Sequence, residues 1–409
     1  MKKTIVILFF LLANVNAQTE QQMTLSLEGA KSYALKNNPH YQIQLKKIDA
    51  QKGMYWSEIV PDKPEIGIEV EEVPPNQAYT NYGEKRVFVE QELDFPSNYF
   101  FRHKILYAEI QRATIQLEEV KREVFFDVKE AYFNLLLQNE FLTLAEKNLQ
   151  LSQDFYNKAK RSYELGESDR LIMLKAKVNF GIAQKGVNAV QKDVETGVSK
   201  LKEVLGLKDQ KIITIVLSDS LPETLVTFSH DLLKQGLQNH PALTMAKLTR
   251  KAAANAKHLA YGNFLPQLSF SYFKQEIDKN DFWGAEVGLS FPLWFMGQTG
   301  QIQQKRAEQT MADYFYIAEQ LRLQKEFDHA IAQLEKAANE VKLFQTELLN
   351  EAEEVFRIAR QSYTVGEIGY LQFIDAQQTL IQTRDGYLKS LFNYQVEKAH
   401  LTKLAGVEL

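Results

Sequence analysis

The strongest constraint on this chain is the absence of glycine and proline from two long stretches, 97–165 and 301–365. Because these residue types interrupt regular structure most strongly, each stretch is predicted to be one continuous helix. At 1.5 Å per residue such a helix is roughly 100 Å long, whereas a helix of a globular protein usually has three or four turns. An ordinary globular core is too small to cover a helix of this length, so the helix requires a packing partner that extends along it.

The chain is also an internal duplication. The pattern Ser162-Tyr163 with Gly166-Glu167 recurs 200 residues later as Ser362-Tyr363 with Gly366-Glu367. Further equivalent pairs are Leu171 and Leu371, Ala176 and Ala376, Leu201 and Leu401, Gly206 and Gly406, Asn38-Pro39 and His240-Pro241, and Phe95-Pro96 and Phe291-Pro292. We therefore predict a first repeat over 18–228 and a second over 229–409.

Each long helix is predicted to end at a glycine suited to a left-handed cap, Gly166 or Gly366, and a shorter helix then returns. The apolar positions of the second long helix follow alternating steps of three and four and predict a coiled-coil seam: Phe327, Ala330, Leu334, Ala337, Val341, Phe344, Leu348, Val355 and Ile358. A similar series begins at Val124 in the first long helix. Bulky residues beside that series, such as Tyr132 and Leu136, predict neighbours on both sides.

Alternation of apolar and polar residues predicts a pair of strands in each repeat, within about 64–95 and 267–292, with helices at about 97–206 and 298–405. A further short strand is predicted over 212–217. Alternating segments of about ten residues with aromatic residues near their ends are typical of a transmembrane β-barrel, although any half-buried hairpin alternates in the same way. Four strands are too few to close a barrel, so three chains would be needed to supply twelve.

The first 17 residues have the pattern of a signal peptide, with Lys2 and Lys3 before an apolar run and a small-residue cleavage site before Gln18. The chain has no cysteine, which excludes disulfides and thiolate metal sites. Its formal net charge of −4 gives no reason to expect nucleic acid as a partner. No nucleophile, base or phosphate-binding motif indicates an enzyme, and the histidines have no ligand spacing, so we predict no cofactor and no metal site.

The order and spacing of several motifs resemble those of the TolC-like outer-membrane efflux proteins: Asn38-Pro39, Phe95-Pro96, 131–136, Ser162-Tyr163 with Gly166, 289–293, and Tyr363 with Gly366 and Asp375-Ala376. The resemblance implies a mostly α fold with a small membrane β part, in which two tandem repeats of a strand pair and a long helical hairpin trimerise into a β-barrel joined to an α-helical barrel. It also implies a passive duct in the cell outer membrane that extends into the periplasm. The implied partners are two further copies of the chain, a periplasmic adaptor (membrane fusion) protein, an inner-membrane pump and outer-membrane lipid.

The segments 64–71 and 91–96 are similar to the branch paired with heavy-metal cation pumps of the cobalt-zinc-cadmium or copper type. The resemblance places adaptor-docking tips at Gly166, Glu167, Ser168, Gly366 and Glu367, and a periplasmic gate at Asp375, Gln372 and Tyr363. The exported substrate is expected to be a small solute or a metal cation. Two alternatives stay open at this point, namely the outer-membrane duct of a type I protein secretion system and a structural coiled-coil envelope protein.

Overall fold

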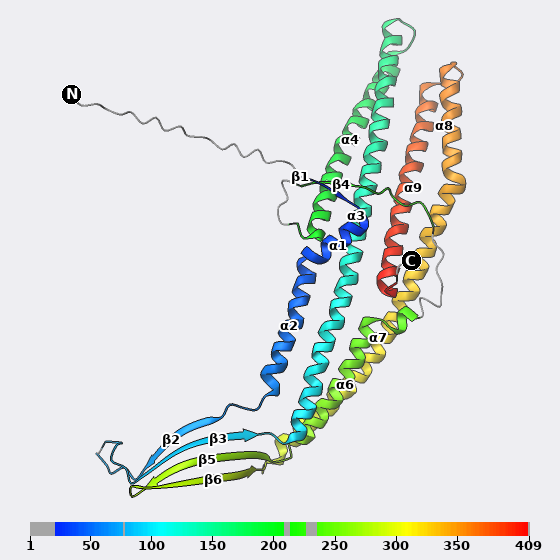
Figure 1. Ribbon diagram of the computed structural model, residues 1–409. Helices are drawn as coiled ribbons and strands as arrows, with labels where there is room; N and C mark the ends of the chain where they lie inside the picture. Colours follow the sequence, from blue (N-terminus) through cyan, green and yellow to red (C-terminus); the bar gives the residue numbers. More distant parts are fainter. Residues whose placement is uncertain (1–20, 77, 208–212, 226–234, 408–409) are drawn as a thin grey trace, which may run out of the picture. The chain divides into compact units, whose positions relative to one another are not determined.

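The computed structural model describes residues 21–76, 78–207, 213–225 and 235–407, and its elements are labelled in Figure 1. The predicted signal peptide lies outside the described residues. The described chain divides into two compact units, one within 1–37, 128–223 and 347–392 and the other within 38–127, 224–346 and 393–409. Each unit contains segments from both predicted repeats.

The second unit contains a four-stranded antiparallel sheet of strands β2 (Glu65–Glu71), β3 (Glu84–Leu93), β5 (Gln267–Ile277) and β6 (Asn280–Ser290). The strand order is β2-β3-β5-β6, so the two predicted strand pairs join through β3 and β5 (Figure 1). The register runs without a break along each pair of strands, and alternate residues therefore lie on opposite faces of the sheet.

Two helices of the same unit start at the two copies of a repeated motif, Asn38-Pro39 and His240-Pro241. They are α2 (Pro39–Ile59) and α6 (Pro241–Gly262), and α6 packs against a long helix, α7 (Phe295–Leu343). The Asn38 side chain accepts a hydrogen bond from the backbone N–H of His40 at 2.9 Å, and His240 Nδ1 accepts one from that of Ala242 at 3.2 Å. The motif is therefore a helix start, with a capping side chain followed by proline in the first turn. The motif is visible in the sequence, but no helix is predicted at either copy of it.

The cap formed by His240 makes the stability of this unit depend on pH. Burial, reinforced by the positive charges of Arg122 and Arg322 and opposed by Glu319, lowers the pKa of His240 from 6.5 to about 4. Protonation would also remove the lone pair that accepts the Ala242 N–H. We expect this contribution, at most about 3 kcal/mol, to be fully present above pH 6.5 and to be lost as the pH falls through about 4.

The test is His240→Asn, which installs the cap that Asn38 provides in the first repeat but does not titrate. Thermal unfolding followed by circular dichroism should show a smaller loss of stability between pH 7 and pH 4 in the variant than in the wild type. Equal losses in both proteins would show that His240 does not carry this dependence.

The first long stretch forms one helix, α3 (Pro96–Glu164), as predicted, and α4 (Arg170–Leu205) follows it. The second stretch is interrupted. It comprises α7, a π-helical segment η1 (Phe344–Leu348) and α8 (Leu349–Thr364), followed by α9 (Tyr370–Ala405). In the first unit, α3 runs beside α4 and α8 beside α9 as two helical hairpins (Figure 1). Among the described residues, no helix combines the length and the apolar character needed to cross a membrane.

The π segment explains where the predicted seam is wrong. The seam residues from Phe327 to Val341 are buried, but Val355 and Ile358 are 49% and 50% exposed. The alternating steps of three and four give positions 351 and 358 as buried. Ala352 and Ala359, each one residue later, are buried instead. A π turn accommodates one extra residue in a helix, so it shifts all later buried positions by one.

The first unit also holds a two-stranded parallel sheet of β1 (Gln21–Leu25) and β4 (Ile213–Leu217), and a short helix α1 (Leu27–Asn37). β4 was predicted and β1 was not. The buried Tyr132 hydroxyl of α3 donates to Asp219 Oδ2 at 2.8 Å, and the same oxygen accepts the Leu27 N–H at 2.9 Å. Burial and the neighbouring Asp219 carboxylate raise the pKa of Tyr132. This network attaches α1 and the parallel sheet to α3.

Candidate functional site

The two helical hairpins of the first unit end in tips with the same backbone conformation. Gly166 and Gly366 both have left-handed φ angles, +75° and +82°. In each tip the glycine N–H donates to the carbonyl oxygen three residues back, and the next N–H donates to the carbonyl oxygen five residues back, at 2.8 Å in both cases. This is the Schellman arrangement, which explains why the sequence pattern repeats at these glycines.

The tips differ immediately after the shared turn. In the first tip the Asp169 side chain caps α4 by accepting the Leu171 N–H at 3.0 Å. In the second tip Gly369 takes that position, and its N–H donates instead to Gln372 Oε1 at 3.1 Å. Gln372, one of the predicted gate residues, is therefore engaged in capping α9. Ile368, at the place of Ser168, packs against a buried aromatic cluster.

That cluster lies between the two hairpins just behind the tips. Its buried members come from α3, α4 and α9: Phe155, Ala159, Ala176, Tyr370 and Phe373. Tyr363, another predicted gate residue, stacks on Phe373 with ring centroids 5.2 Å apart, and burial raises the pKa of Tyr363. The Tyr363 side chain thus packs within the cluster, whereas its equivalent in the first repeat, Tyr163, is exposed.

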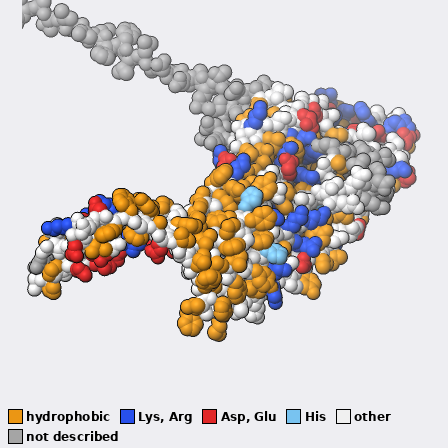
Figure 2. Space-filling model, turned by 60° about the horizontal axis from the view of Figure 1, so that its bottom comes forward, with side chains coloured by type: hydrophobic (Ala, Val, Ile, Leu, Met, Phe, Trp, Pro, Cys, Tyr) orange, Lys and Arg blue, Asp and Glu red, His pale blue; other side chains and the backbone are white. Residues whose placement is uncertain are grey.

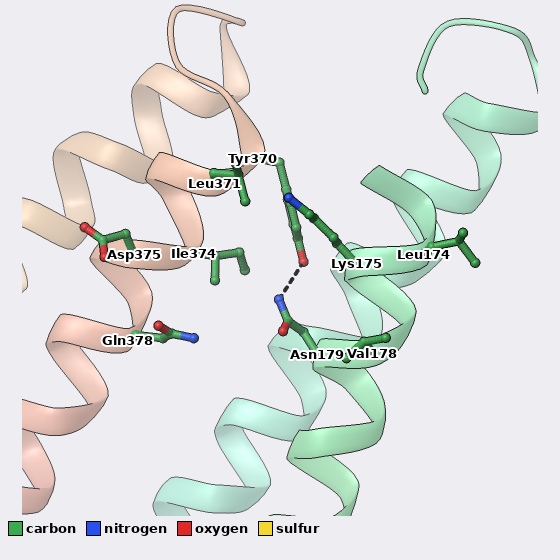
Figure 3. A pocket seen from close by; sticks show the side chains of 9 residues that line it. All are labelled: Leu174, Lys175, Val178, Asn179, Tyr370, Leu371, Ile374, Asp375 and Gln378. Carbon is green, nitrogen blue, oxygen red and sulfur yellow. Dashed lines mark hydrogen bonds between the residues drawn. The ribbon is translucent and has the colours of Figure 1, made fainter. Parts of the chain in front are cut away.

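Asp375, the third predicted gate residue, lines an open groove of about 440 Å³ between α4 and α9 (Figure 3). Lys175, its equivalent in the first repeat, lines the same groove. Figure 3 shows Lys175 extending toward Tyr370, whereas the Asp375 carboxylate lies on the side of α9 turned away from Lys175. Within the described residues Lys175 and Asp375 form no ion pair. The Asp375 side chain is exposed.

One hydrogen bond crosses this groove. Asn179 Nδ2 of α4 donates to the hydroxyl oxygen of Tyr370 of α9 at 3.2 Å (Figure 3). Tyr370 is buried in the aromatic cluster, so its hydroxyl holds the first turn of α9 against α4. Neither residue is predicted from the sequence, because neither stands out in composition or spacing.

We expect the Tyr370–Asn179 bond to couple the two hairpins by about 0.5–1.5 kcal/mol, the usual net contribution of a neutral hydrogen bond. A double-mutant cycle of Tyr370→Phe and Asn179→Ala, read by thermal unfolding, measures this coupling. Additive effects of the two substitutions would show that the bond contributes nothing. Tyr163→Phe, which alters the exposed tyrosine of the first tip, is the control and should leave stability unchanged.

In the second unit the two faces of the sheet have opposite character. One face carries mostly apolar side chains: Ile66, Ile68, Val70, Val87, Val89, Leu93, Leu268, Phe270, Tyr272, Trp283, Ala285, Val287 and Leu289. Most of them are exposed, and Figure 2 shows hydrophobic side chains gathered along the sheet and over the neighbouring helix ends. The charged residues of this face lie at its hairpin-turn end: Lys85, Lys274, Glu276 and Asp281. Such a face is suited to lipid.

The opposite face, here called the polar face, is strongly acidic. The register places seven glutamates on it: Glu65, Glu69, Glu71, Glu84, Glu90, Glu92 and Glu286. Arg86 is the single basic residue among the described positions of this face. The described part of the chain contains no group of three or more histidine, cysteine, aspartate or glutamate side chains placed to hold a metal ion.

Comparison with solved structures defines the class of protein. Crystal structures of CusC match with a TM-score of 0.78 over 97% of this chain and 95% of that chain, at 19% identity. The open-state structure of the Neisseria gonorrhoeae MtrE outer membrane channel matches with a TM-score of 0.78 over 94% of this chain and 89% of that chain, at 15% identity. The strand pairs and long helical hairpins of this chain are therefore the fold of a TolC-like outer-membrane channel.

The sequence itself gives the family. The family described as outer membrane efflux protein matches residues 87–207 and 232–407, and the chain belongs to this family. Among its relatives, the cobalt-zinc-cadmium resistance protein CzcC of Cupriavidus metallidurans is 23% identical over 368 residues, which are 89% of this chain and 86% of that protein.

These findings confirm the predicted fold class, localisation and general function. The chain is a non-enzymatic efflux channel of the outer membrane, with a helical extension into the periplasm. Channels of this class form trimers in tripartite efflux systems. The family membership excludes the alternative prediction of a structural coiled-coil envelope protein.

Proposed function

We propose that this channel exports metal cations as a homotrimer, in which the polar face of each sheet lines the pore and the apolar face meets outer-membrane lipid. The observation that carries the proposal is the polar face, with seven glutamates and one arginine in each chain. A pathway lined by one sign of charge concentrates ions of the opposite sign. The relative CzcC, described as a cobalt-zinc-cadmium resistance protein, supports the same class of substrate.

The periplasmic partners in this proposal are an adaptor protein that docks on the two tips and an inner-membrane pump that supplies the energy. The tips Gly166, Glu167, Ser168, Gly366 and Glu367 support docking because they are the turns at the free ends of the helical hairpins. Asp375 supports a gate because its exposed side chain lines a groove between those hairpins. The channel itself is passive.

The test of the substrate class is growth and metal content of cells that lack the gene. Deletion should sensitise cells to zinc, cobalt or cadmium by several-fold and raise their content of that metal, and a plasmid copy should restore both. Unchanged metal tolerance combined with the loss of a secreted protein would instead favour the duct of a type I protein secretion system.

A further inference from the structure

One row of residues across the polar face concentrates negative charge. Glu65 lies opposite Glu90, Glu90 opposite Ser271, and Ser271 opposite Glu286, so each strand contributes one residue. Glu65 and Glu90 lie directly opposite on neighbouring strands, where Cβ atoms are about 5 Å apart, and like charges at that separation destabilise a sheet. Glu90 and Glu286 are two strands apart, with Ser271 between them. A bound cation would offset this repulsion.

The serine in this row lacks a partner. Ser271 is 8% exposed, and its hydroxyl is buried without a hydrogen bond to any described residue. An unpaired buried hydroxyl costs free energy, so its position between Glu90 and Glu286 calls for an explanation. Hydroxyl and carboxylate oxygens together are the kind of ligand that hard divalent cations prefer.

The row already has a cationic neighbour that belongs to the chain. Arg86 Nη2 of β3 donates to Glu286 Oε2 of β6 at 3.3 Å, so the Arg86 side chain crosses β5 to reach it. On the way the guanidinium lies over the Phe273 ring, 4.0 Å from its centroid. That ring lies against Gly284, where a Cβ atom would come within 2.3 Å of it. The glycine therefore leaves room for the ring that supports Arg86.

We propose that Glu90, Ser271 and Glu286 form a binding site, here called the station, for a hydrated divalent cation. In the absence of that cation the Arg86 guanidinium neutralises the site, and a mobile cation displaces it. Two carboxylates and one hydroxyl leave most of the coordination sphere to water. Such binding is weak enough for the ion to be released again, which conduction requires. Only the orientation of the station toward a pore rests on the proposed function. Cation binding itself requires neither the pore nor a particular pump.

The test uses the purified full-length channel in detergent, with Mn²⁺ as the probe and free Mn²⁺ measured by electron paramagnetic resonance. Arg86→Met removes the positive charge that competes with Mn²⁺ for Glu286. Opposite charges within a few ångströms of each other attract by more than about 1 kcal/mol, so the loss of this competitor should tighten Mn²⁺ binding at one site per chain by about tenfold. Lys85→Met is the matched control. It removes the same charge from the next residue, which lies on the opposite face, and should leave Mn²⁺ binding unchanged.

Two further variants locate the site. Adding Glu90→Gln to Arg86→Met should abolish the gain, whereas adding Glu92→Gln, an equal change two residues along the same strand and face, should preserve it. Ser271→Ala changes no charge and should weaken Mn²⁺ binding by several-fold even if the arginine variant does not fold.

Equal effects of Arg86→Met and Lys85→Met, or a gain that survives Glu90→Gln, would overturn the station. If cells fail to depend on the channel for metal tolerance while these Mn²⁺ differences hold, the proposed substrate fails and the station stands.

Discussion

Replacing Asp375 with alanine should abolish the block of the channel by divalent cations. In the proposed trimer one Asp375 from each chain would form a ring of three carboxylates at the periplasmic mouth. Two such charges repel each other by about 1 kcal/mol at close range in water and by more where solvent is restricted. A divalent cation that bridges the ring would relieve this repulsion and obstruct conduction.

Single-channel recording in a planar bilayer, with divalent cations added on the periplasmic side, measures this effect. Asp385→Ala is the matched control, because Asp385 is also on α9 but is paired with Lys389 at 2.7 Å. The block should persist in this control. A block that survives Asp375→Ala unchanged would mean that Asp375 does not line the mouth.

The structure also separates the roles of the three predicted gate residues. Gln372 caps α9 through Gly369, and Tyr363 packs in the aromatic cluster. We therefore expect substitutions of these two residues to act through the stability of the second tip. Asp375 is the gate candidate whose charge remains exposed beside the groove.

Much of the fold could be predicted from the sequence, because the deciding signals are local. A glycine in the left-handed region ends each long helix, and alternation over 7 to 11 residues defines each strand of the four-stranded sheet. Both signals depend only on the conformational preferences of neighbouring residues. The sequence order of the strands also agrees with their order in the sheet.

The elements that were missed depend on distant partners or on a single extra residue. β1 is only five residues long, and its polar–apolar alternation covers just Gln22–Leu25, which is too short a pattern to predict a strand. The strand forms by pairing with β4, which is nearly 200 residues away. The π segment contains no glycine or proline, so nothing in its composition marks it. Its effect is nevertheless large, since every buried position of α8 shifts by one.

The candidate site was only partly predictable for a related reason. Charged residues such as Asp375 stand out when the two repeats are compared, because Lys175 is the equivalent residue. The Tyr370–Asn179 bond and the Arg86–Glu286 pair do not stand out in such a comparison, because each joins residues from different repeats. Only the packed structure shows which side chains meet.

The first tip offers a sharp test of adaptor docking, because its central glycine can be changed without disturbing the protein's own packing. A Cβ atom built at Gly166 meets no atom within 4 Å. The cost to the chain is therefore the strain of a non-glycine residue at φ +75°, about 1–2 kcal/mol. Asparagine tolerates this conformation better than other residues, which provides a control for the strain.

Replacing Gly166 with tryptophan should abolish efflux in cells while trimers still accumulate in the outer membrane, because the bulky side chain would occupy the surface where the adaptor meets the tip. Efflux is measured as metal tolerance, and trimers by native electrophoresis of membrane extracts. Gly166→Asn should retain efflux, which separates the loss of a binding surface from backbone strain. Gly366→Trp should have a smaller effect, because Ile368 turns inward to the aromatic cluster where the first tip has Ser168. Efflux that persists in Gly166→Trp would show that Gly166 is a helix cap and that the adaptor docks elsewhere.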